Sequence, residues 1–215
     1  MKSSMNKITY AITVCNELTE LETLFQNIWT GVRKSDEIVI QGDLGNVRDD
    51  VKEYCRSIIA NHKNILYTEF PLNNDFSAFK NNLFKFSTGD YIFQVDADEI
   101  PHENLIRNLP ALLDEYSDMD LFLVPRINTV AGLTEDWIKK WNWRVNENGW
   151  VNYPDFQYRI YKNDYPRLHW VGKVHERIMG FSNYTSLPIE EQWSLYHPKK
   201  LDRQIKQNER YDKMV

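Results

Sequence analysis

An apolar stretch near the middle of the chain ends in three carboxylates within four positions, Asp96, Asp98 and Glu99. The residues before them, from Tyr91 to Val95, predict a buried strand. Carboxylates packed this closely repel one another and raise each other's pKa, unless a divalent cation neutralises them. Magnesium is commonly held by one or two carboxylates together with the phosphates of a substrate. The cluster therefore indicates a metal site for a phosphorylated substrate.

Taken alone, the same stretch is also consistent with a solvated acidic turn before a helix that begins at Pro101. In that interpretation Asp98 or Glu99 lies near the positive end of the helix. An Asp-x-Asp tripeptide is common by chance, so by itself it favours the turn. Its place directly after a buried strand, in a chain that alternates strands and helices, favours the metal site instead.

The first half of the chain alternates apolar runs with apolar residues at helical spacing. These patterns predict strands at 8–15, 37–40, 65–70 and 91–95, and helices at 18–28, 47–59 and about 75–86. Parallel strands are usually joined by helical crossovers, so this order predicts an α/β fold with a mostly parallel, doubly wound sheet. Ligands bind at the carboxyl ends of the strands in such a sheet, where Asp43 and the carboxylate cluster both lie.

The second half of the chain is less regular. Short strands are predicted at 121–125, 156–161 and 168–171, and a polar helix from Leu201 onward. Four of the seven tryptophans stand close together, Trp137, Trp141, Trp143 and Trp150. An indole face matches the apolar face of a sugar ring, so the group could form an acceptor platform, but core packing is the plainer explanation. We expect some to pack in the core and at least one to reach the cleft.

Length and composition predict a single domain over residues 1–215, with a nucleotide-binding half at about 1–105 and a smaller α+β acceptor-binding half at about 106–215. The net charge of -5 argues against nucleic acid as a partner. Two cysteines and no apolar run approaching about 20 residues predict a soluble protein of a reducing compartment. We therefore expect a cytoplasmic protein, with peripheral contact at the inner face of a membrane if the acceptor is held there.

Four segments, taken in order, resemble glycosyltransferase family 2. They are residues 8–17, residues 38–43, residues 74–81, and residues 88–91 followed by 96–99. The likeness is closest to the branch that includes the lipopolysaccharide-core β-glucosyltransferases, and it covers roughly residues 7–105. The resemblance implies a GT-A fold, a nucleotide-sugar donor and a role in polysaccharide biosynthesis.

The resemblance implies a pocket for the nucleotide base at the end of the first strand. Thr13 and Cys15 match positions that form this pocket, with Asn16 and Glu17 at its mouth. Asp43 matches the carboxylate that recognises the base. The structural alternatives are a turn cap for Asp43, an ordinary buried strand residue for Thr13 and an exposed helical lysine for Lys80.

Other matched positions are implied to face the sugar and the diphosphate. Lys80 and Asn81 match basic and amide positions that look toward the donor. Asp96 and Asp98 match the Asp-x-Asp motif, with Asp98 as the direct ligand of Mn²⁺ or Mg²⁺ and Asp96 assisting. His197 stands where many GT-A enzymes place a late histidine near the metal, and imidazole suits Mn²⁺ better than Mg²⁺. A single histidine before a proline is otherwise more often a surface residue.

A carboxylate in the second half is needed to remove a proton from the acceptor hydroxyl. Residues 158–161 and 169–176 are similar to the C-terminal half of the same branch, in which a His-Glu pair follows a strand. Glu176 is the first choice for the general base and Asp155 the second. A structural hydrogen-bonded pair of His175 and Glu176 at a turn is the alternative.

The resemblance implies an inverting, metal-dependent transfer of a sugar from a nucleoside diphosphate, a UDP-sugar by default, to a glycan or lipid-linked acceptor. One rival is a sugar-nucleotide nucleotidyltransferase, which usually begins with a glycine-rich loop, and residues 11–20 contain no glycine. A second rival is an inactive carbohydrate-binding relative. Such a relative would be expected to lose the metal carboxylates, and both are present.

Overall fold

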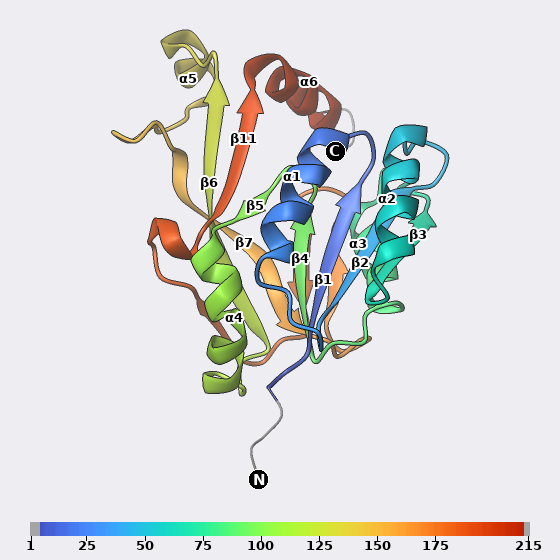
Figure 1. The fold of residues 1–215 in the computed structure, drawn as a ribbon. Coiled ribbons are helices and arrows are strands. Elements are labelled where there is room, and N and C mark those ends of the chain that lie inside the picture. The colour runs from blue at the N-terminus through green and yellow to red at the C-terminus, as the bar shows by residue number, and fades with distance from the viewer. Residues whose placement is uncertain (1–4, 213–215) are drawn as a thin grey trace.

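The computed structural model describes residues 5–212, and the side chains of residues 5–209 (Figure 1). The strands are β1 (Ile8–Val14), β2 (Glu37–Asp43), β3 (Ile65–Phe70), β4 (Tyr91–Asp96), β5 (Ile100–Pro101), β6 (Leu121–Ala131), β7 (Val151–Lys162), β8 (His169–Val171), β9 (Arg177–Met179), β10 (Tyr184–Ser186) and β11 (Leu195–Lys200). The helices are α1 (Leu18–Trp29), α2 (Asp49–Asn61), α3 (Phe76–Phe84), α4 (Glu103–Glu115), α5 (Glu135–Trp141) and α6 (Leu201–Asp212), with a 3₁₀ turn at Glu191–Trp193.

One sheet runs through both halves of the chain in the order β3-β2-β1-β4-β7-β6-β11-β5, with β10 also paired to β6. The pairs β1–β2, β1–β4, β2–β3 and β6–β11 are parallel, whereas β7 is antiparallel to both β4 and β6. The predicted α/β fold with a mostly parallel sheet is therefore confirmed. Because β7 lies between β4 and β6, it joins the two halves edge to edge.

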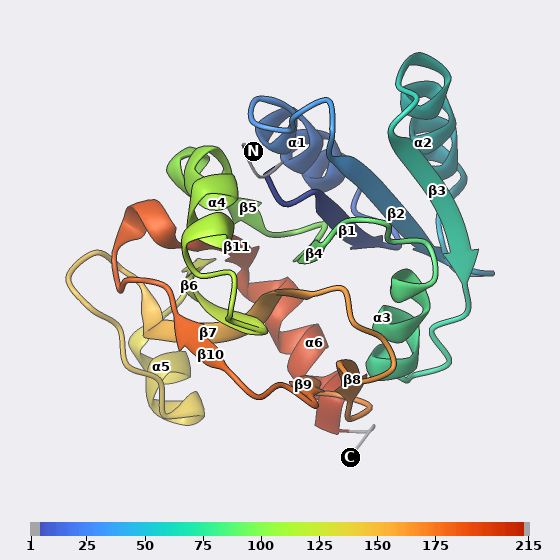
Figure 2. The same cartoon turned by 90° about the horizontal axis from the view of Figure 1, so that it is seen from below.

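Helices cover both faces of this sheet (Figure 2). On one face α1, α2 and α4 pack with fully buried side chains such as Leu21, Val51 and Leu105. On the other face α3 and the β8–β9 hairpin bury Leu83 and Trp170. The longest helices, α2 and α4, have 13 residues, and no helix in the described part of the chain is long and apolar enough to cross a membrane.

From residue 100 onward the structure departs from the sequence prediction. Strands β6 and β7 extend well beyond the predicted 121–125 and 156–161, and β11 was not predicted at all. The helix predicted from Pro101 begins at Glu103, because Pro101 pairs with Leu195 in β5. Strands β6, β7 and β11 carry half-buried polar side chains, so their apolar alternation is weak and long-range pairing decides their extent.

Candidate active site

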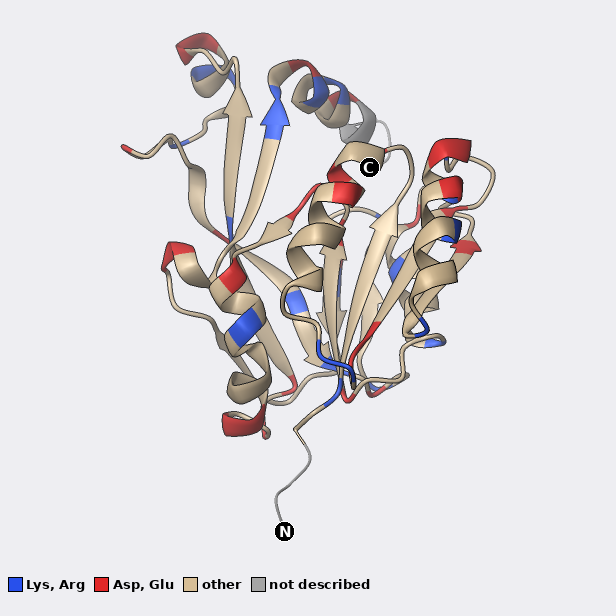
Figure 3. Ribbon diagram, in the orientation of Figure 1, with Lys and Arg blue, Asp and Glu red and all other residues tan. Residues whose placement is uncertain are grey.

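A pocket of about 850 Å³ opens at the carboxyl ends of β1, β2 and β4 and is closed by β6, β7, β11 and α6. Its lining includes every predicted site residue except Asn81: Thr13, Cys15, Asn16, Glu17, Asp43, Lys80, Asp96, Asp98, Asp155, Glu176 and His197. Predicted site residues up to 184 positions apart, Thr13 and His197, thus share one cavity, since the sheet brings the two halves together. Basic residues mark the end of β11 and the start of α6 at this edge (Figure 3).

The loops at the carboxyl ends of β1 and β2 are held by two carboxylates. Glu17 accepts hydrogen bonds from the backbone N–H groups of Cys15 and Asn16, both at 2.9 Å. Asp43 is 6% exposed and accepts from the backbone N–H of Leu72 at 2.9 Å. Asp43 therefore anchors the segment after β3, accepts from Asn46 Nδ2 in its own turn at 3.1 Å, and lines the pocket.

Asp96 is bonded through both of its carboxylate oxygens. Its register opposite Thr13 in the β1–β4 pair brings the threonine hydroxyl to Oδ1 at 2.7 Å. Oδ2 accepts from Arg159 Nη2 at 2.6 Å, and Lys80 Nζ lies 3.5 Å from Oδ1. Burial acts to raise the pKa of Asp96, but the Arg159 and Lys80 cations outweigh it and hold that pKa far below its usual value.

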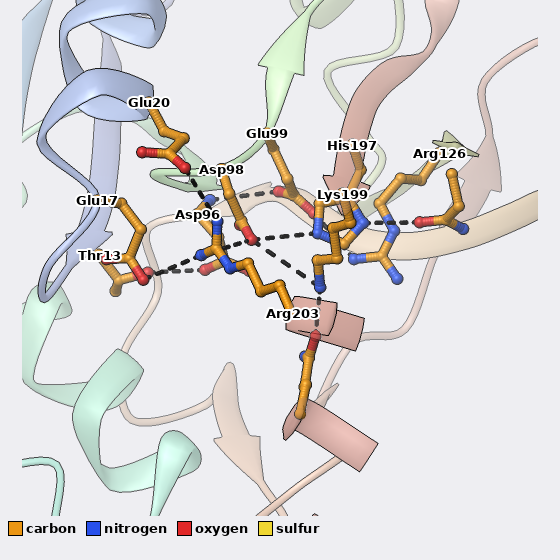
Figure 4. A network of polar contacts seen from close by, with 12 residues as sticks. Thr13, Glu17, Glu20, Asp96, Asp98, Glu99, Arg126, His197, Lys199 and Arg203 are labelled. Carbon is orange, nitrogen blue, oxygen red and sulfur yellow. Dashed lines mark hydrogen bonds and ion pairs between the residues drawn. The ribbon is translucent and has the colours of Figure 1, made fainter. Parts of the chain in front are cut away.

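Asp98 faces a group of basic side chains from the C-terminal part of the chain (Figure 4). Its Oδ2 lies 3.4 Å from His197 Nε2, 3.4 Å from Arg203 Nη2 and 3.9 Å from Lys199 Nζ. Burial acts to raise the pKa of Asp98, but His197 and Lys199 lower it well below the usual range. The carboxylate is therefore ionised at neutral pH.

The tautomer of His197 follows from its neighbours. Asn128 donates its amide N–H to Asp155 Oδ2 at 2.8 Å, which leaves the amide oxygen to accept from His197 Nδ1 at 2.7 Å. Burial lowers the pKa of His197, while its contact with Asp98 acts to raise it. In the neutral imidazole the proton on Nδ1 leaves the Nε2 lone pair directed at Asp98. Nε2 and the Asp98 oxygen are then two acceptors facing each other, an arrangement that suits a cation between them.

A divalent metal fits this pair of acceptors. Within residues 5–212 no group of three or more His, Cys, Asp or Glu side chains is gathered to hold a metal ion. Asp98 and His197 would hold the ion, and phosphate oxygens and water would complete its coordination. Asp96, predicted to assist, is already engaged with Thr13 and Arg159. A carboxylate with imidazole favours Mn²⁺ over Mg²⁺.

Two arginines that the sequence analysis missed organise the buried charges of the pocket. Glu99, fully buried, accepts from Arg159 Nη2 at 2.5 Å and from Arg126 Nη1 at 3.0 Å. Arg126 in turn donates to Asp155 Oδ2 at 2.7 Å, its register partner across β6 and β7. Positive and negative groups therefore alternate through the floor of the pocket. We call this set the charge ladder: Glu176, Lys80, Asp96, Arg159, Glu99, Arg126 and Asp155.

A sequence signal for these arginines did exist. Polar residues alternate with apolar ones along β7, where Asp155, Gln157 and Arg159 share one face, and Arg126 and Asn128 do the same along β6. Charged residues at every second position of a strand indicate a polar face, and when that face is buried its side chains need hydrogen-bond or ion-pair partners. The partners themselves could not be found without the strand order.

The β8–β9 hairpin presents Glu176 to the pocket. Asn81 fixes the hairpin to α3, because its side-chain amide donates to the carbonyl of Trp170 and accepts from its N–H, each at 2.8 Å. Glu176 Oε1 accepts from Lys80 Nζ at 2.5 Å, and this ammonium also lies over the Trp170 ring. Burial acts to raise the pKa of Glu176, but Lys80 brings it below the ordinary value.

Asp155 is more heavily bonded than Glu176. Its Oδ2 receives N–H groups from Arg126 and Asn128, and its Oδ1 receives the Gln157 amide at 2.7 Å. Burial acts to raise the pKa of Asp155, but Arg126 holds it below the usual value. Glu176, with one side-chain donor, is the freer of the two predicted bases.

One of the four clustered tryptophans, Trp143, lines the pocket. Trp137, Trp141 and Trp143 form a run of ring contacts with centroid separations of 4.7 and 4.5 Å. Trp150 instead packs against Tyr153 at 4.8 Å. All four are partly exposed rather than buried in the core, so they form a half-exposed aromatic surface beside the cavity.

Comparisons with known proteins agree with this architecture. Residues 9–174 match the sequence model of the family described as Glycosyl transferase family 2. No curated protein matches the chain. Among solved structures, TarS residues 1–349 of S. aureus aligns with a TM-score of 0.61 and 12% identity over 89% of this chain and 60% of that one.

Two further TarS structures give similar values. TarS of S. aureus aligns with a TM-score of 0.62 and 12% identity over 89% of this chain and 36% of that one. TarS 1–349 in complex with UDP-GlcNAc aligns with a TM-score of 0.64 and 13% identity over 90% of this chain and 58% of that one. This likeness shows the fold, and the chain spans between 36% and 60% of the length of these proteins.

Replacing Arg159 by methionine removes the guanidinium that bonds both Asp96 and Glu99. We expect the free energy of unfolding, measured by urea denaturation, to fall by about 3–5 kcal/mol, because buried carboxylates lose their cation. Arg107→Met is the matched control, since Arg107 is exposed and pairs with exposed Glu103, and it should change stability by less than about 0.5 kcal/mol. Equal urea midpoints for Arg159→Met and Arg107→Met would contradict the conclusion that Arg159 stabilises the buried carboxylates.

The effect of Arg159→Met should depend on pH. In the wild type the folded-state pKa of Asp96 is depressed, so its stabilisation is complete above the unfolded value of about 3.9 and is lost as the pH falls through the folded value. In the variant, burial raises that pKa again and the carboxyl can protonate in the folded state. The stability difference between the two proteins should be largest at pH 7 and shrink toward pH 3. A difference that does not vary with pH would refute this electrostatic explanation.

Proposed function

Given that the chain belongs to glycosyl transferase family 2, we propose that it transfers a sugar from a nucleoside diphosphate to a glycan or lipid-linked acceptor, with inversion and with a divalent metal. The observation that carries this proposal is the meeting of Asp98 and His197 in the pocket at the carboxyl edge of the sheet. Nucleotide ligands of open α/β sheets bind at this edge.

The donor diphosphate is assigned to the part of the pocket beside Asp98. Asp98 and His197 hold Mn²⁺ or Mg²⁺, which when bound supplies positive charge that neutralises the leaving diphosphate. Asp155 and Asn128 act on His197 indirectly, since they fix the tautomer that turns Nε2 toward Asp98. Asp96 keeps Lys80 and Arg159 in place beneath the sugar.

The nucleotide is assigned to the loops at the ends of β1 and β2. Thr13, Cys15, Asn16 and Glu17 form one wall, and Asp43 faces them from β2. A UDP-sugar is the favoured donor, from the family resemblance and from the UDP-GlcNAc complex of TarS, which shares the fold.

Glu176 is assigned as the general base. It is ionised at neutral pH because the Lys80 ammonium lowers its pKa. The acceptor hydroxyl oxygen attacks the anomeric carbon, the bond from that carbon to the diphosphate oxygen breaks, and the hydroxyl proton passes to Glu176. A single displacement inverts the anomeric centre.

The acceptor is assigned to the second half of the chain, residues 106–215, within one domain whose first half binds the donor. Trp143 lines the pocket and offers a flat apolar face to a sugar ring. The finer likeness to the lipopolysaccharide-core β-glucosyltransferase branch, the cytoplasmic location and contact with a membrane surface stay predictions.

The metal assignment is tested with a panel of nucleotide sugars in the presence of Mn²⁺ or Mg²⁺. We expect the wild type to release nucleoside diphosphate from one donor, and Asp98→Asn to lower that rate by at least about 100-fold. Asp49→Asn, a neutralised exposed aspartate at the start of α2, serves as the control for loss of one charge. Release that survives in Asp98→Asn would refute the metal site, and no release from any donor would favour an inactive carbohydrate-binding relative.

The base assignment is tested by comparing Glu176→Gln with Asp155→Asn. Loss of general-base catalysis should lower kcat of Glu176→Gln by about 100-fold or more with little change in nucleotide affinity. The acidic limb of the pH–rate profile, which reports protonation of the base, should also disappear. If Asp155→Asn loses that limb and Glu176→Gln retains it, the base is Asp155.

A further inference from the structure

We propose that Lys199 and Arg203 form a cationic subsite for the diphosphate of the donor, carried by β11 and α6 and distinct from the metal-holding pair. The inference rests on the proposed function, because it presumes a nucleoside diphosphate ligand. It assigns to the C-terminal segment a role in donor binding that lies outside the matched family region, residues 9–174.

Both side chains reach the pocket from adjoining elements. Lys199 follows His197 by two residues on β11, so the two point to the same side of the strand. Arg203 lies in the first turn of α6, whose residues Arg203, Gln204, Lys206, Gln207 and Asn208 form part of the pocket wall. Figure 4 shows both cationic groups directed at Asp98.

Lys199 and Arg203 both face the single carboxylate of Asp98, so the cations beside this carboxylate outnumber it and favour an anionic ligand. The three cations of the charge ladder each have a carboxylate oxygen within 3.0 Å. Lys199 is 9% exposed, yet its nearest ion-pair partner is Asp98 at 3.9 Å, beyond hydrogen-bond reach. Its ammonium instead donates to the neutral amide oxygen of Gln207. A buried ammonium with this little compensation is costly unless a ligand supplies negative charge.

Asp98 cannot serve the metal and both cations at once. With a divalent ion on Asp98 and His197, Lys199 and Arg203 would face further positive charge across a few ångströms. A diphosphate between them removes that conflict, since its oxygens can accept from the ammonium and from the fork of the guanidinium. The metal and the two side chains would then contact one anion from different sides.

Arg203 also ties this subsite to the nucleotide end of the pocket. It donates to Glu17 Oε1 at 3.1 Å and to Glu20 Oε1 at 3.0 Å. Glu17 is the residue that holds the backbone of Cys15 and Asn16. Arg203 is therefore anchored beside the loop assigned to the base, at the position where a nucleotide's phosphates would leave that loop.

The test is calorimetric binding of UDP and UMP without metal, in EDTA, with GDP and GMP in parallel. Without the metal, the difference in affinity between UDP and UMP reports how strongly the protein's own side chains bind the β-phosphate. We expect the wild type to bind the diphosphate more tightly than the monophosphate. Arg203→Gln and Lys199→Gln should each weaken the binding of UDP by about tenfold or more, as expected for loss of a charge-assisted hydrogen bond. Each should also move the ratio of UDP affinity to UMP affinity toward one.

Two control variants separate phosphate contact from other effects. Lys200→Gln makes the same charge change at the exposed neighbour of Lys199 and should leave the ratio unchanged. Glu20→Gln keeps Arg203 but removes one of its links to α1. If Glu20→Gln lowers the ratio as much as Arg203→Gln, the effect comes from attachment of α6 and the inference is wrong.

The remaining outcomes distinguish this inference from the proposed function. Unchanged UDP affinity in both Arg203→Gln and Lys199→Gln would overturn the cationic subsite while leaving the proposed transferase intact. Failure of the wild type to bind UDP or GDP, with or without Mn²⁺, would overturn the proposed function and the subsite with it.

Discussion

The bonds from Arg159 to Asp96 and Glu99 are the interaction on which the rest of the pocket depends. They allow a buried strand to end in several carboxylates without a metal directly on each one. Burying these carboxylates unpaired would cost several kcal/mol each. Arg159 comes from β7, the strand that joins the two halves of the sheet, so the same pairing that unites the halves also neutralises the end of β4.

The main effect of the charge ladder is to fix the positions of the carboxylates in the pocket, rather than to stabilise the fold. Replacing buried ion pairs by apolar groups is often neutral or stabilising, so seven alternating charges are a poor means of holding a fold together. What they provide is a defined place for each carboxylate. Asp155 at one end orients His197 through Asn128, and Glu176 at the other end is held by Lys80. A site of this kind needs its charges set in advance, because preorganised groups need no rearrangement during the reaction.

The C-terminal segment completes this arrangement from outside the ladder. β11 adds His197 and Lys199 to the sheet edge through its parallel pairing with β6, in which His197 stands opposite Asn128. α6 then turns back over the pocket and is tied to the β1–α1 loop through Arg203. The first and last elements of the chain thereby meet over one cavity, and the wall they form carries the positive charge that an anionic donor requires.

The sequence by itself determined the α/β alternation of the first half and the position of Asp43, Asp96 and Asp98 at strand ends, because apolar periodicity and strand ends are local properties. Through the family resemblance it also named eleven of the residues that line the pocket, whereas Asn81, named with them, does not line it. Tertiary structure alone decided which charges meet. Arg159 lies 63 positions from Asp96, and that pairing follows from the antiparallel insertion of β7, which leaves no mark in local spacing. β11 was missed for the same reason. Its polar side chains face a cavity and become buried only when the sheet has formed, so the local sequence shows no apolar alternation that would predict a strand.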